Sequence, residues 1–507
     1  MYQACTTLPG RRACCALRAL LSQPRLLSPL RAPLLPLLPL LPLLLLLAWQ
    51  PAQAAQTLPP EALQSLQRAA VPAEAMSVVV HDATSGRSVL QWQEQRPVNP
   101  ASLMKLLTTM AALDRLGPAF TWATPVWLTG PIKDGVLEGS VFIKGSGDPK
   151  LVLERVWLLL RRVQQQGVRE IRGDIILDSS AFVVPEAAAA DFDGEPLRPY
   201  NVRPAALLLN FRSVTYTFVP DEAAGVARVA VEPALAGTQT DRTVPLQSGA
   251  ASPCGDWRSA LKASFEAGRT RFAGSYNSAC GELNWPVADP QPATFEARLV
   301  DALWREMGGL LQGSVREGLA PMELKPTFEQ RSPALAELVR DISKYSNNVM
   351  AQQLFYTLAL QARKTSPATL DSARDTLARW LAERTGELGA EVVLDNGSGL
   401  SRQTRISALR LARLLTQNFD SPVMSELMSS LPISGLDGTL RRSRATAGRA
   451  HLKTGSLRDV AGVAGYVLSN SGRRYVVVAI INHANANAAR PALDAVVQWT
   501  IRDAPAR

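Results

Sequence analysis

Two residues in the first quarter of the chain have the types and the spacing that acyl transfer requires. Such a reaction needs a nucleophile, a base that takes its proton, and donors for the oxyanion. Ser102 and Lys105 form Ser-x-x-Lys, and residues three apart on a helix share a face, so the Lys105 amine can reach the Ser102 hydroxyl. Ser102 follows a break at residues 99–101 and opens an apolar stretch to Leu113. The free N–H groups of a helix start favour negative charge there.

This pattern by itself is weak, because a capping serine and a solvated lysine would give the same letters. By average composition, Ser-x-x-Lys occurs about once or twice by chance in a chain of this length. It does recur as Ser259-Ala260-Leu261-Lys262, inside the amphipathic stretch Trp257–Phe265. Position favours Ser102, because only Ser102 opens a helix after a chain break.

A second polar cluster precedes another apolar helix. In Ser346-Asn347-Asn348, the Ser346 hydroxyl can relay a proton and the Asn348 amide can hold a substrate carbonyl. A simple capping cluster is the bland alternative, since Ser and Asn favour helix starts. Tyr345-Ser346-Asn347 would also fit a Tyr-x-Asn pattern; we favour Ser-x-Asn.

A third cluster, Lys453-Thr454-Gly455-Ser456, stands just before a predicted β-hairpin. Lys and Thr at a strand edge suit a substrate carboxylate, and Gly lets another backbone come close. An ordinary turn is the alternative. The order of the three motifs is more specific than any one of them, because each sits on the element that its role needs.

This order resembles the signature of penicillin-binding proteins and class A β-lactamases. The chain is similar to the D-Ala-D-Ala carboxypeptidase/endopeptidase family of the penicillin-binding protein 4 type over residues 57–507. The wide gap between the first two motifs also fits this family, in which an insertion separates them. Further matching stretches are Gly145–Pro149, Asp395–Arg402 and Ser434–Thr439.

The resemblance implies a role for each matching position. The catalytic residues would be Ser102 as nucleophile, Lys105 as its base, and Ser346 and Asn348 on the second wall of the site. The backbone N–H groups of Ser102 and Ser456 would form the oxyanion hole. The substrate-binding residues would be Lys453, Thr454, Gly455, Ser456, Leu400, Arg402, Leu457 and Arg458, with Glu195, close to Asp191 and Asp193, for the free amine of the substrate. Core packing for Leu400 and Leu457, and ordinary surface charge for the acids, are the alternatives.

The implied reaction is cleavage of D-alanyl peptide bonds in peptidoglycan stem peptides and cross-links through a serine acyl-enzyme. β-Lactams would be covalent inhibitors, and no metal or organic cofactor is implied. A β-lactamase and a catalytically silent wall-binding protein are the two alternatives. The insertion, and the lack of an identifiable deacylating Glu near Asp395, argue against the first; intact Ser102, Lys105 and Lys453 argue against the second.

The first 54 residues have the layout of a secretory signal. They contain five arginines and no acid, then an apolar run from Leu34 to Trp49, then Ala52-Gln53-Ala54. Cleavage there predicts a periplasmic protein, with a membrane anchor as the alternative. Without these arginines the formal net charge falls from +10 to +5. That excess is mild, so the sequence predicts no nucleic-acid partner and at most weak membrane or cell-wall association.

Cysteine usage agrees with export. Only Cys254 and Cys280 remain after the leader, and in an oxidising compartment a disulfide is favoured over two free thiols. The three histidines, His81, His451 and His483, are too scattered to predict a metal site.

Periodicity divides the rest of the chain. Residues 77–92 predict a hairpin, short β-like runs fill residues 122–290, and helical patterns and a last hairpin follow. The expected fold is therefore an α/β (α+β) sandwich: an antiparallel sheet flanked by helices, transpeptidase-like, with a mainly β inserted region. The predicted segments are a signal peptide (1–54), the first part of the catalytic domain (55–121), the inserted region (122–290) and the second part of the catalytic domain (291–507).

Overall fold

The computed structural model describes residues 57–247, 253–363 and 367–503. The predicted signal peptide, residues 1–54, lies outside the described residues. Within the described ranges, no helix is both long enough and apolar enough to cross a bilayer.

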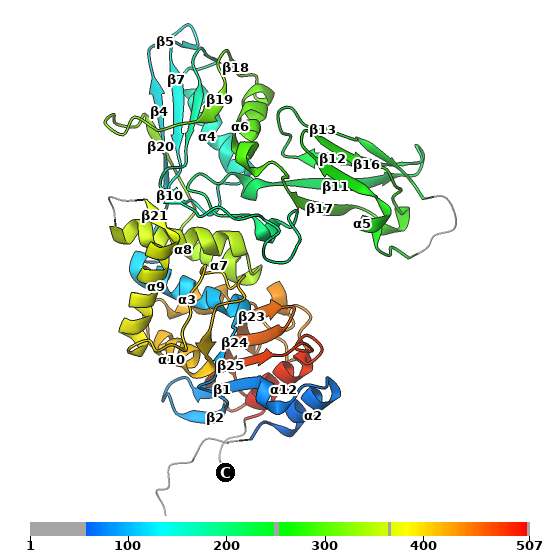
Figure 1. Cartoon of the computed structure of the whole chain (residues 1–507), viewed down its shortest axis with the longest axis vertical. Coiled ribbons are helices and arrows are strands. Elements are labelled where there is room, and N and C mark those ends of the chain that lie inside the picture. Colours follow the sequence, from blue (N-terminus) through cyan, green and yellow to red (C-terminus); the bar gives the residue numbers. More distant parts are fainter. Residues whose placement is uncertain (1–56, 248–252, 364–366, 504–507) are drawn as a thin grey trace, which may run out of the picture. The chain divides into compact units, whose positions relative to one another are not determined.

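A five-stranded antiparallel sheet joins the beginning and the end of the described chain (Figure 1). Its strand order is β2-β1-β25-β24-β23, so β23 lies at one edge. The hairpin predicted at residues 77–92 is confirmed as β1 and β2. The strands are β1 (Met76–Asp82), β2 (Ser88–Trp92), β23 (Ala450–Leu457), β24 (Val460–Leu468) and β25 (Arg474–Asn482).

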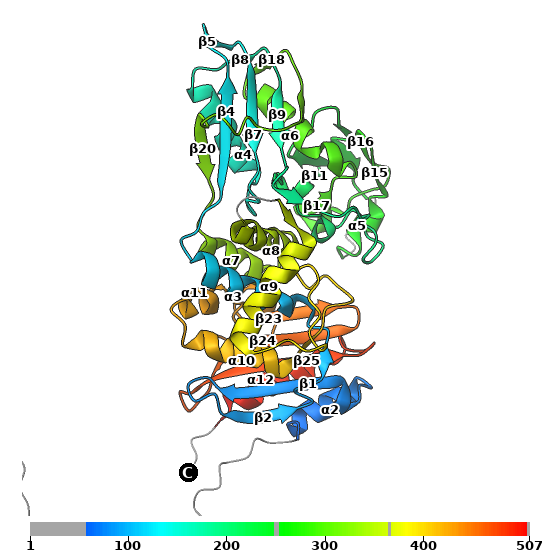
Figure 2. The ribbon, with the colours of Figure 1, turned by 60° about the vertical axis from the view of Figure 1, so that its left-hand side comes forward.

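Helices cover both faces of this sheet. Alternate side chains of each strand point to opposite faces, so apolar residues along β25 contribute to a core on each side. Val476, Val478 and Ile480 of β25 belong to one hydrophobic core. Their neighbours Val477 and Ala479 belong to the other, which includes the helices α2 (Pro60–Arg68) and α12 (Arg490–Ile501) (Figures 1 and 2). The predicted sandwich is therefore confirmed.

Helices supply most of the first core. Each carries apolar residues at helical spacing, and their buried side chains form that core. The helices are α3 (Met104–Leu116), α7 (Leu335–Lys344), α8 (Asn348–Arg363), α9 (Leu370–Thr385), α10 (Ala408–Phe419) and α11 (Met424–Ser430). Two short strands, β3 (Pro97–Val98) and β22 (Ile406–Ser407), pair antiparallel beside them.

The inserted region begins with a five-stranded mixed sheet, order β19-β9-β7-β4-β20, and a four-stranded sheet, order β18-β8-β6-β5. The strands are β4 (Ala123–Thr129), β5 (Ile132–Lys133), β6 (Val136–Leu137), β7 (Ser140–Lys144), β8 (Glu170–Ile171), β9 (Ile175–Asp178), β18 (Leu310–Leu311), β19 (Val315–Glu317) and β20 (Phe328–Arg331). Two helices pack on these sheets, α4 (Leu153–Gln165) and α6 (Phe295–Glu306).

Two features of this region differ from the sequence prediction. β20 pairs with β4 and β19 with β9, so the sheet continues to Arg331, beyond the predicted boundary at residue 290. β19 and β20 are three and four residues long, too short for a clear alternating pattern. Helix α4 interrupts the part that was predicted to be mainly β; its buried residues are Val156, Leu159, Leu160 and Val163.

The inserted region also contains two further sheets, of four and three strands. The first has the order β14-β12-β11-β17 and the second β13-β16-β15. The elements are β11 (Ser213–Asp221), β12 (Val226–Glu232), β13 (Gln239–Thr240), β14 (Thr243–Pro245), α5 (Trp257–Ala260), β15 (Ala263–Glu266), β16 (Arg269–Phe272) and β17 (Leu283–Ala288). A disulfide between Cys254 and Cys280 links the segments before α5 and before β17. A parallel pair, β10 (Phe182–Val183) with β21 (Ala368–Thr369), joins the inserted region to the helical part of the chain.

Candidate active site

Ser102 lies in a single 3-10 turn, Ala101–Leu103, directly before α3. Ala101 has a positive φ of 47°, which is uncommon for a residue with a side chain. The Asn99 side chain fixes this turn: its Oδ1 accepts from the Ala101 N–H at 2.8 Å, and its Nδ2 donates to the Ser401 carbonyl at 2.9 Å. The strained turn therefore holds Ser102 at the start of the helix. Sequence reasoning treated Asn99 only as part of a chain break.

Lys105 lies in the first turn of α3 and is completely buried. Its Nζ donates to Ser102 Oγ at 2.9 Å, to Asn348 Oδ1 at 2.6 Å and to the Ser398 carbonyl at 2.6 Å. No carboxylate is among these partners. Burial first, and then the charge of Lys453, lower the pKa of Lys105 well below its usual value. A neutral amine beside a serine hydroxyl can act as a general base.

Ser346 and Asn348 belong to the turn between α7 and α8. Ser346 has a φ of 55°, and its Oγ accepts a hydrogen bond from Lys453 Nζ at 2.8 Å. Asn348 begins α8 and accepts from Lys105. Tyr345 is 74% exposed, and Asn347 Oδ1 accepts from the Met350 N–H as a helix cap does. The side chains that reach the two lysines are thus those of the Ser-x-Asn register.

Strand β23 carries the third cluster along the free edge of the sheet. The Leu452 N–H donates to the Pro432 carbonyl, away from β24. Since the direction of backbone groups alternates along a strand, the N–H groups of Thr454 and Ser456 point the same way. Gly455 permits the close approach of this edge to the Ser102 turn, because a Cβ there would lie 2.6 Å from the Pro100 carbonyl oxygen.

Lys453 is as deeply buried as Lys105. Its Nζ donates to Ser346 Oγ and to the Thr454 carbonyl, each at 2.8 Å. Burial lowers the pKa of Lys453 to about 7. The Thr454 hydroxyl donates to Thr439 Oγ1 at 2.7 Å. Hydrogen bonds thus join Lys105 to Ser102 and Asn348, and Lys453 to Ser346. The charge of Lys453 also acts on Lys105, so three separate stretches of sequence meet in one site.

The segment that begins at residue 395 reaches Lys105 because Gly399 packs closely against the Ser102 turn. Gly399 has a φ of 79°, and a Cβ on it would lie 1.8 Å from the Ala101 carbonyl oxygen. This contact allows the Ser398 carbonyl to reach Lys105. Spacing in the sequence could not show what Gly399 approaches.

The remaining predicted binding residues occupy the surroundings. Arg402 makes an ion pair with Asp459 at 2.8 Å, and its guanidinium lies 4.9 Å from the centre of the Phe192 ring. Leu400 and Leu457 are half-buried, and Arg458 is exposed.

The three acids proposed for an amine contact are placed differently from one another. Glu195 forms an exposed ion pair with Arg198 at 3.2 Å, and Asp191 accepts from the Ala188 N–H. Asp193 accepts from Tyr200 Oη and Asn201 Nδ2. Burial acts to raise the pKa of Asp193, but hydrogen bonds from Asn201 and Tyr200 outweigh it and lower that pKa.

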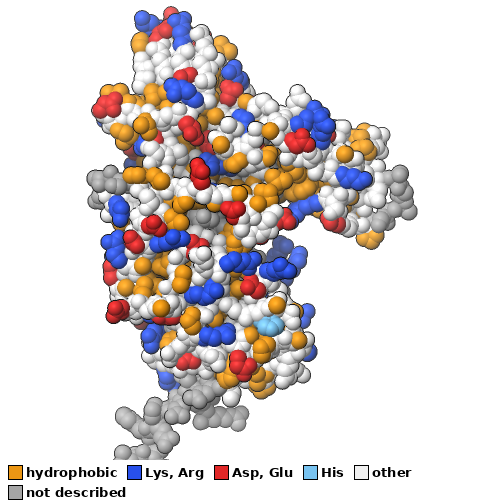
Figure 3. Space-filling view, in the orientation of Figure 1, with side chains coloured by type: hydrophobic (Ala, Val, Ile, Leu, Met, Phe, Trp, Pro, Cys, Tyr) orange, Lys and Arg blue, Asp and Glu red, His pale blue; other side chains and the backbone are white. Residues whose placement is uncertain are grey.

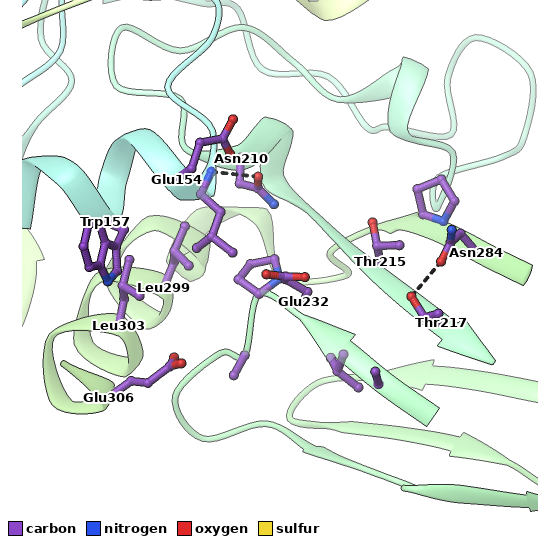
Figure 4. A pocket seen from close by; sticks show the side chains of 16 residues that line it. Glu154, Trp157, Asn210, Thr215, Thr217, Glu232, Asn284, Leu299, Leu303 and Glu306 are labelled. Atoms are coloured by element: carbon purple, nitrogen blue, oxygen red, sulfur yellow. Dashed lines mark hydrogen bonds between the residues drawn. The ribbon is translucent and has the colours of Figure 1, made fainter. Parts of the chain in front are cut away.

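A cavity of about 930 Å³ lies away from these residues, in the inserted region. Figure 4 shows Trp157 of α4 and Leu299, Leu303 and Glu306 of α6 on one side, with Thr215 and Thr217 of β11 on the other. Its lining contains carboxylates and threonines but no lysine. Chemistry, and not volume, therefore places the candidate active site beside Ser102. Figure 3, in the orientation of Figure 1, shows acidic and basic side chains interspersed over this face of the molecule.

The fold and this serine–lysine group define a class, the serine acyl-transfer enzymes with a helix-covered antiparallel sheet. The comparisons narrow it further. The model of the D-Ala-D-Ala carboxypeptidase 3 (S13) family matches residues 62–503, and the chain belongs to this family. It is therefore a peptidase of the penicillin-binding serine D,D-carboxypeptidase type, as the sequence predicted.

Individual relatives are distant but cover most of the chain. A D-alanyl-D-alanine carboxypeptidase of Haemophilus influenzae is 25% identical over 75% of this chain and 80% of its own length. One from an Actinomadura species is 27% identical over 81% of this chain and 78% of its own. The crystal structure of Haemophilus influenzae penicillin binding protein 4 superimposes with a TM-score of 0.68 at 22% identity, covering 83% of this chain and 93% of that one.

Proposed function

We propose that the protein removes terminal D-alanine from peptidoglycan stem peptides through an acyl-enzyme on Ser102. The observation that carries the proposal is the environment of Lys105: it is fully buried, has no carboxylate partner in the described part of the chain and donates to Ser102 Oγ at 2.9 Å. In its neutral form, Lys105 takes the Ser102 proton while the oxygen attacks the carbonyl of the penultimate D-alanine. The bond from serine oxygen to carbon forms, and the carbon–nitrogen bond then breaks.

The leaving amine must receive a proton for that bond to break. Lys105, protonated by the first step, is the source of this proton, and the Ser346 hydroxyl can relay it. Ser346 is held by Lys453 at 2.8 Å, and Asn348 by Lys105 at 2.6 Å. D-Alanine leaves, and water then hydrolyses the acyl-enzyme with Lys105 again as base. Cleavage of a D-alanyl cross-link follows the same route, with a longer amine as leaving group.

The other residues bind the substrate and stabilise its charge. The N–H of Ser456, on the free edge of β23, and that of Ser102 are the oxyanion donors that the family resemblance implies. Lys453 and Thr454 would hold the terminal carboxylate. Leu400, Arg402, Leu457 and Arg458 would border the peptide, and an acid from residues 191–195 would contact its amine.

β-Lactams would acylate the same serine, because the cyclic amide occupies the place of the D-alanyl bond. The crystal structure of the Haemophilus influenzae protein has also been determined with a β-lactam, and that complex has a TM-score of 0.64 to this chain. We place the protein in the periplasm. The signal-like leader supports this, and so does the disulfide between Cys254 and Cys280, which suits an oxidising compartment.

The test uses a synthetic stem pentapeptide ending in D-Ala-D-Ala and its analogue ending in D-Ala-L-Ala. Wild-type protein should release alanine from the first peptide only, and a fluorescent penicillin should form a stable band and stop the release. Fast hydrolysis of the penicillin without a band would indicate a β-lactamase. A folded protein that neither releases alanine nor forms a band would contradict the proposal.

A further inference from the structure

Arg490 brings a positive charge to the end of β23 without an acidic partner. It is the first residue of α12 and is exposed. Its Nη2 donates to Ser456 Oγ at 2.5 Å, and to Asn487 Oδ1 at 2.9 Å. Among the described residues, no carboxylate forms an ion pair with Arg490, and its Nη1 atom donates to none of them.

Helix stability does not explain this placement. The N-terminus of a helix carries partial positive charge, so a cation in the first turn is unfavourable there. Asn487 nevertheless fixes the guanidinium in position. The Asn487 Oδ1 accepts from Arg490, while its Nδ2 donates to the carbonyls of Leu457 and Arg458 at 2.9 and 3.0 Å. Arg490 is thus held rigidly relative to the strand that would bind the substrate.

The chemistry of this corner fits an anion. Ser456 and Thr454 are two residues apart on β23, so their side chains share a face. A guanidinium binds a carboxylate through two parallel hydrogen bonds and keeps its charge at any pH of interest. Lys453 does not keep its charge, because burial lowers its pKa to about 7. A second cation that keeps its charge would therefore strengthen the binding of a peptide carboxylate at neutral pH.

We propose that Arg490 is a specificity-determining residue that binds the terminal carboxylate of the substrate together with the Ser456 hydroxyl. The inference rests on the proposed function, because that function supplies the carboxylate. Arg490 takes no part in proton transfer, and its contribution should depend on the negative charge of the leaving group.

The experiment compares two D-alanyl thioester substrates whose leaving groups differ only in bearing a carboxylate or its methyl ester. Arg490→Gln should lower kcat/KM for the carboxylate substrate by about tenfold or more, mainly through KM, since a charge-assisted hydrogen bond is lost. The ester substrate should change by less than about threefold, within the range of a neutral hydrogen bond. Arg490→Lys should recover part of the loss. Arg502→Gln is the matched control, because Arg502 directly follows the last residue of the same helix and forms an exposed ion pair with Glu61.

Each other outcome decides the matter. Equal losses on both substrates in Arg490→Gln would show that Arg490 only supports the structure, and no loss on either would show that it is not used; both overturn the inference alone. A folded wild-type protein that cleaves neither thioester would overturn the proposed function together with it.

Discussion

Two segments of this chain have the same letters, Ser-x-x-Lys, and entirely different surroundings. Lys105 is buried and donates to Ser102, because both lie at the start of a helix that continues to Leu116. Ser259 is exposed, and its hydroxyl donates to Asp256 at 2.7 Å. Helix α5 ends at Ala260, and Lys262 has a φ of 45°, so this lysine is outside the helix. The spacing brings the two side chains together only where the helix continues.

The largest difference between the two segments should come from removing the lysine. Lys105→Met should slow acylation by penicillin by roughly 10² to 10⁴-fold, the usual contribution of a general base. Lys262→Met should leave the rate unchanged. Stopped-flow measurement of acylation checks both variants, with circular dichroism to show that each is folded. Acylation of Lys105→Met protein at the wild-type rate would show that Lys105 is not the general base.

Glycine-to-alanine substitutions near each serine compare how tightly the backbone packs around Ser102 and around Ser259. Gly399→Ala would force a Cβ to within 1.8 Å of the Ala101 carbonyl at a positive φ, so the Ser102 turn must move. We expect a lower melting temperature and acylation slowed by about tenfold or more, since an ångström of displacement can cost about a hundredfold in rate. Gly255→Ala, near Ser259, meets no atom of the described residues within 4 Å and should change neither quantity. Equal melting temperatures and rates for the two variants would argue against this close contact.

The pH dependence tests the second buried lysine, which the Ser259 segment lacks. The charged form of Lys453 predominates below its pKa of about 7 and is lost above it. The preference for a substrate with a terminal carboxylate over its ester, expressed as a ratio of kcat/KM, should therefore fall as pH rises through 7. The ratio cancels the ionisation of Lys105, which affects both substrates. In Lys453→Arg the fall should disappear; its persistence would assign the titration to another group.

The smallest effect on acylation should come from the disulfide beside the Ser259 segment. The double variant Cys254→Ser/Cys280→Ser opens a loop with a sequence separation of 26 residues. Loss of such a link typically costs about 2–4 kcal/mol of stability. Limited proteolysis should therefore cut the inserted region faster, while penicillin labelling keeps its rate. A large loss of labelling in protein that resists proteolysis would show that this region acts on the active site.

The sequence predicted the sandwich, the helices of its core and the residues that meet around Lys105, because long periodic segments and ordered motifs carry strong signals. It did not predict the contact of Gly399 with Ala101, or the hydrogen bonds by which Asn99 joins Ala101 to Ser401. Both depend on segments about 300 residues apart in sequence, for which local patterns carry no signal. The same holds for β20. Its pairing with β4 extends the sheet of the inserted region to Arg331, beyond the predicted boundary at residue 290.

The most direct test of the central claim is to find which serine carries penicillin. Wild-type protein is incubated with a penicillin, digested and examined by mass spectrometry, alongside Ser102→Ala and Ser259→Ala. The adduct should lie on Ser102 in wild-type and Ser259→Ala protein, and folded Ser102→Ala should carry none. An adduct on Ser259, or on any residue of folded Ser102→Ala, would contradict the assignment of the nucleophile.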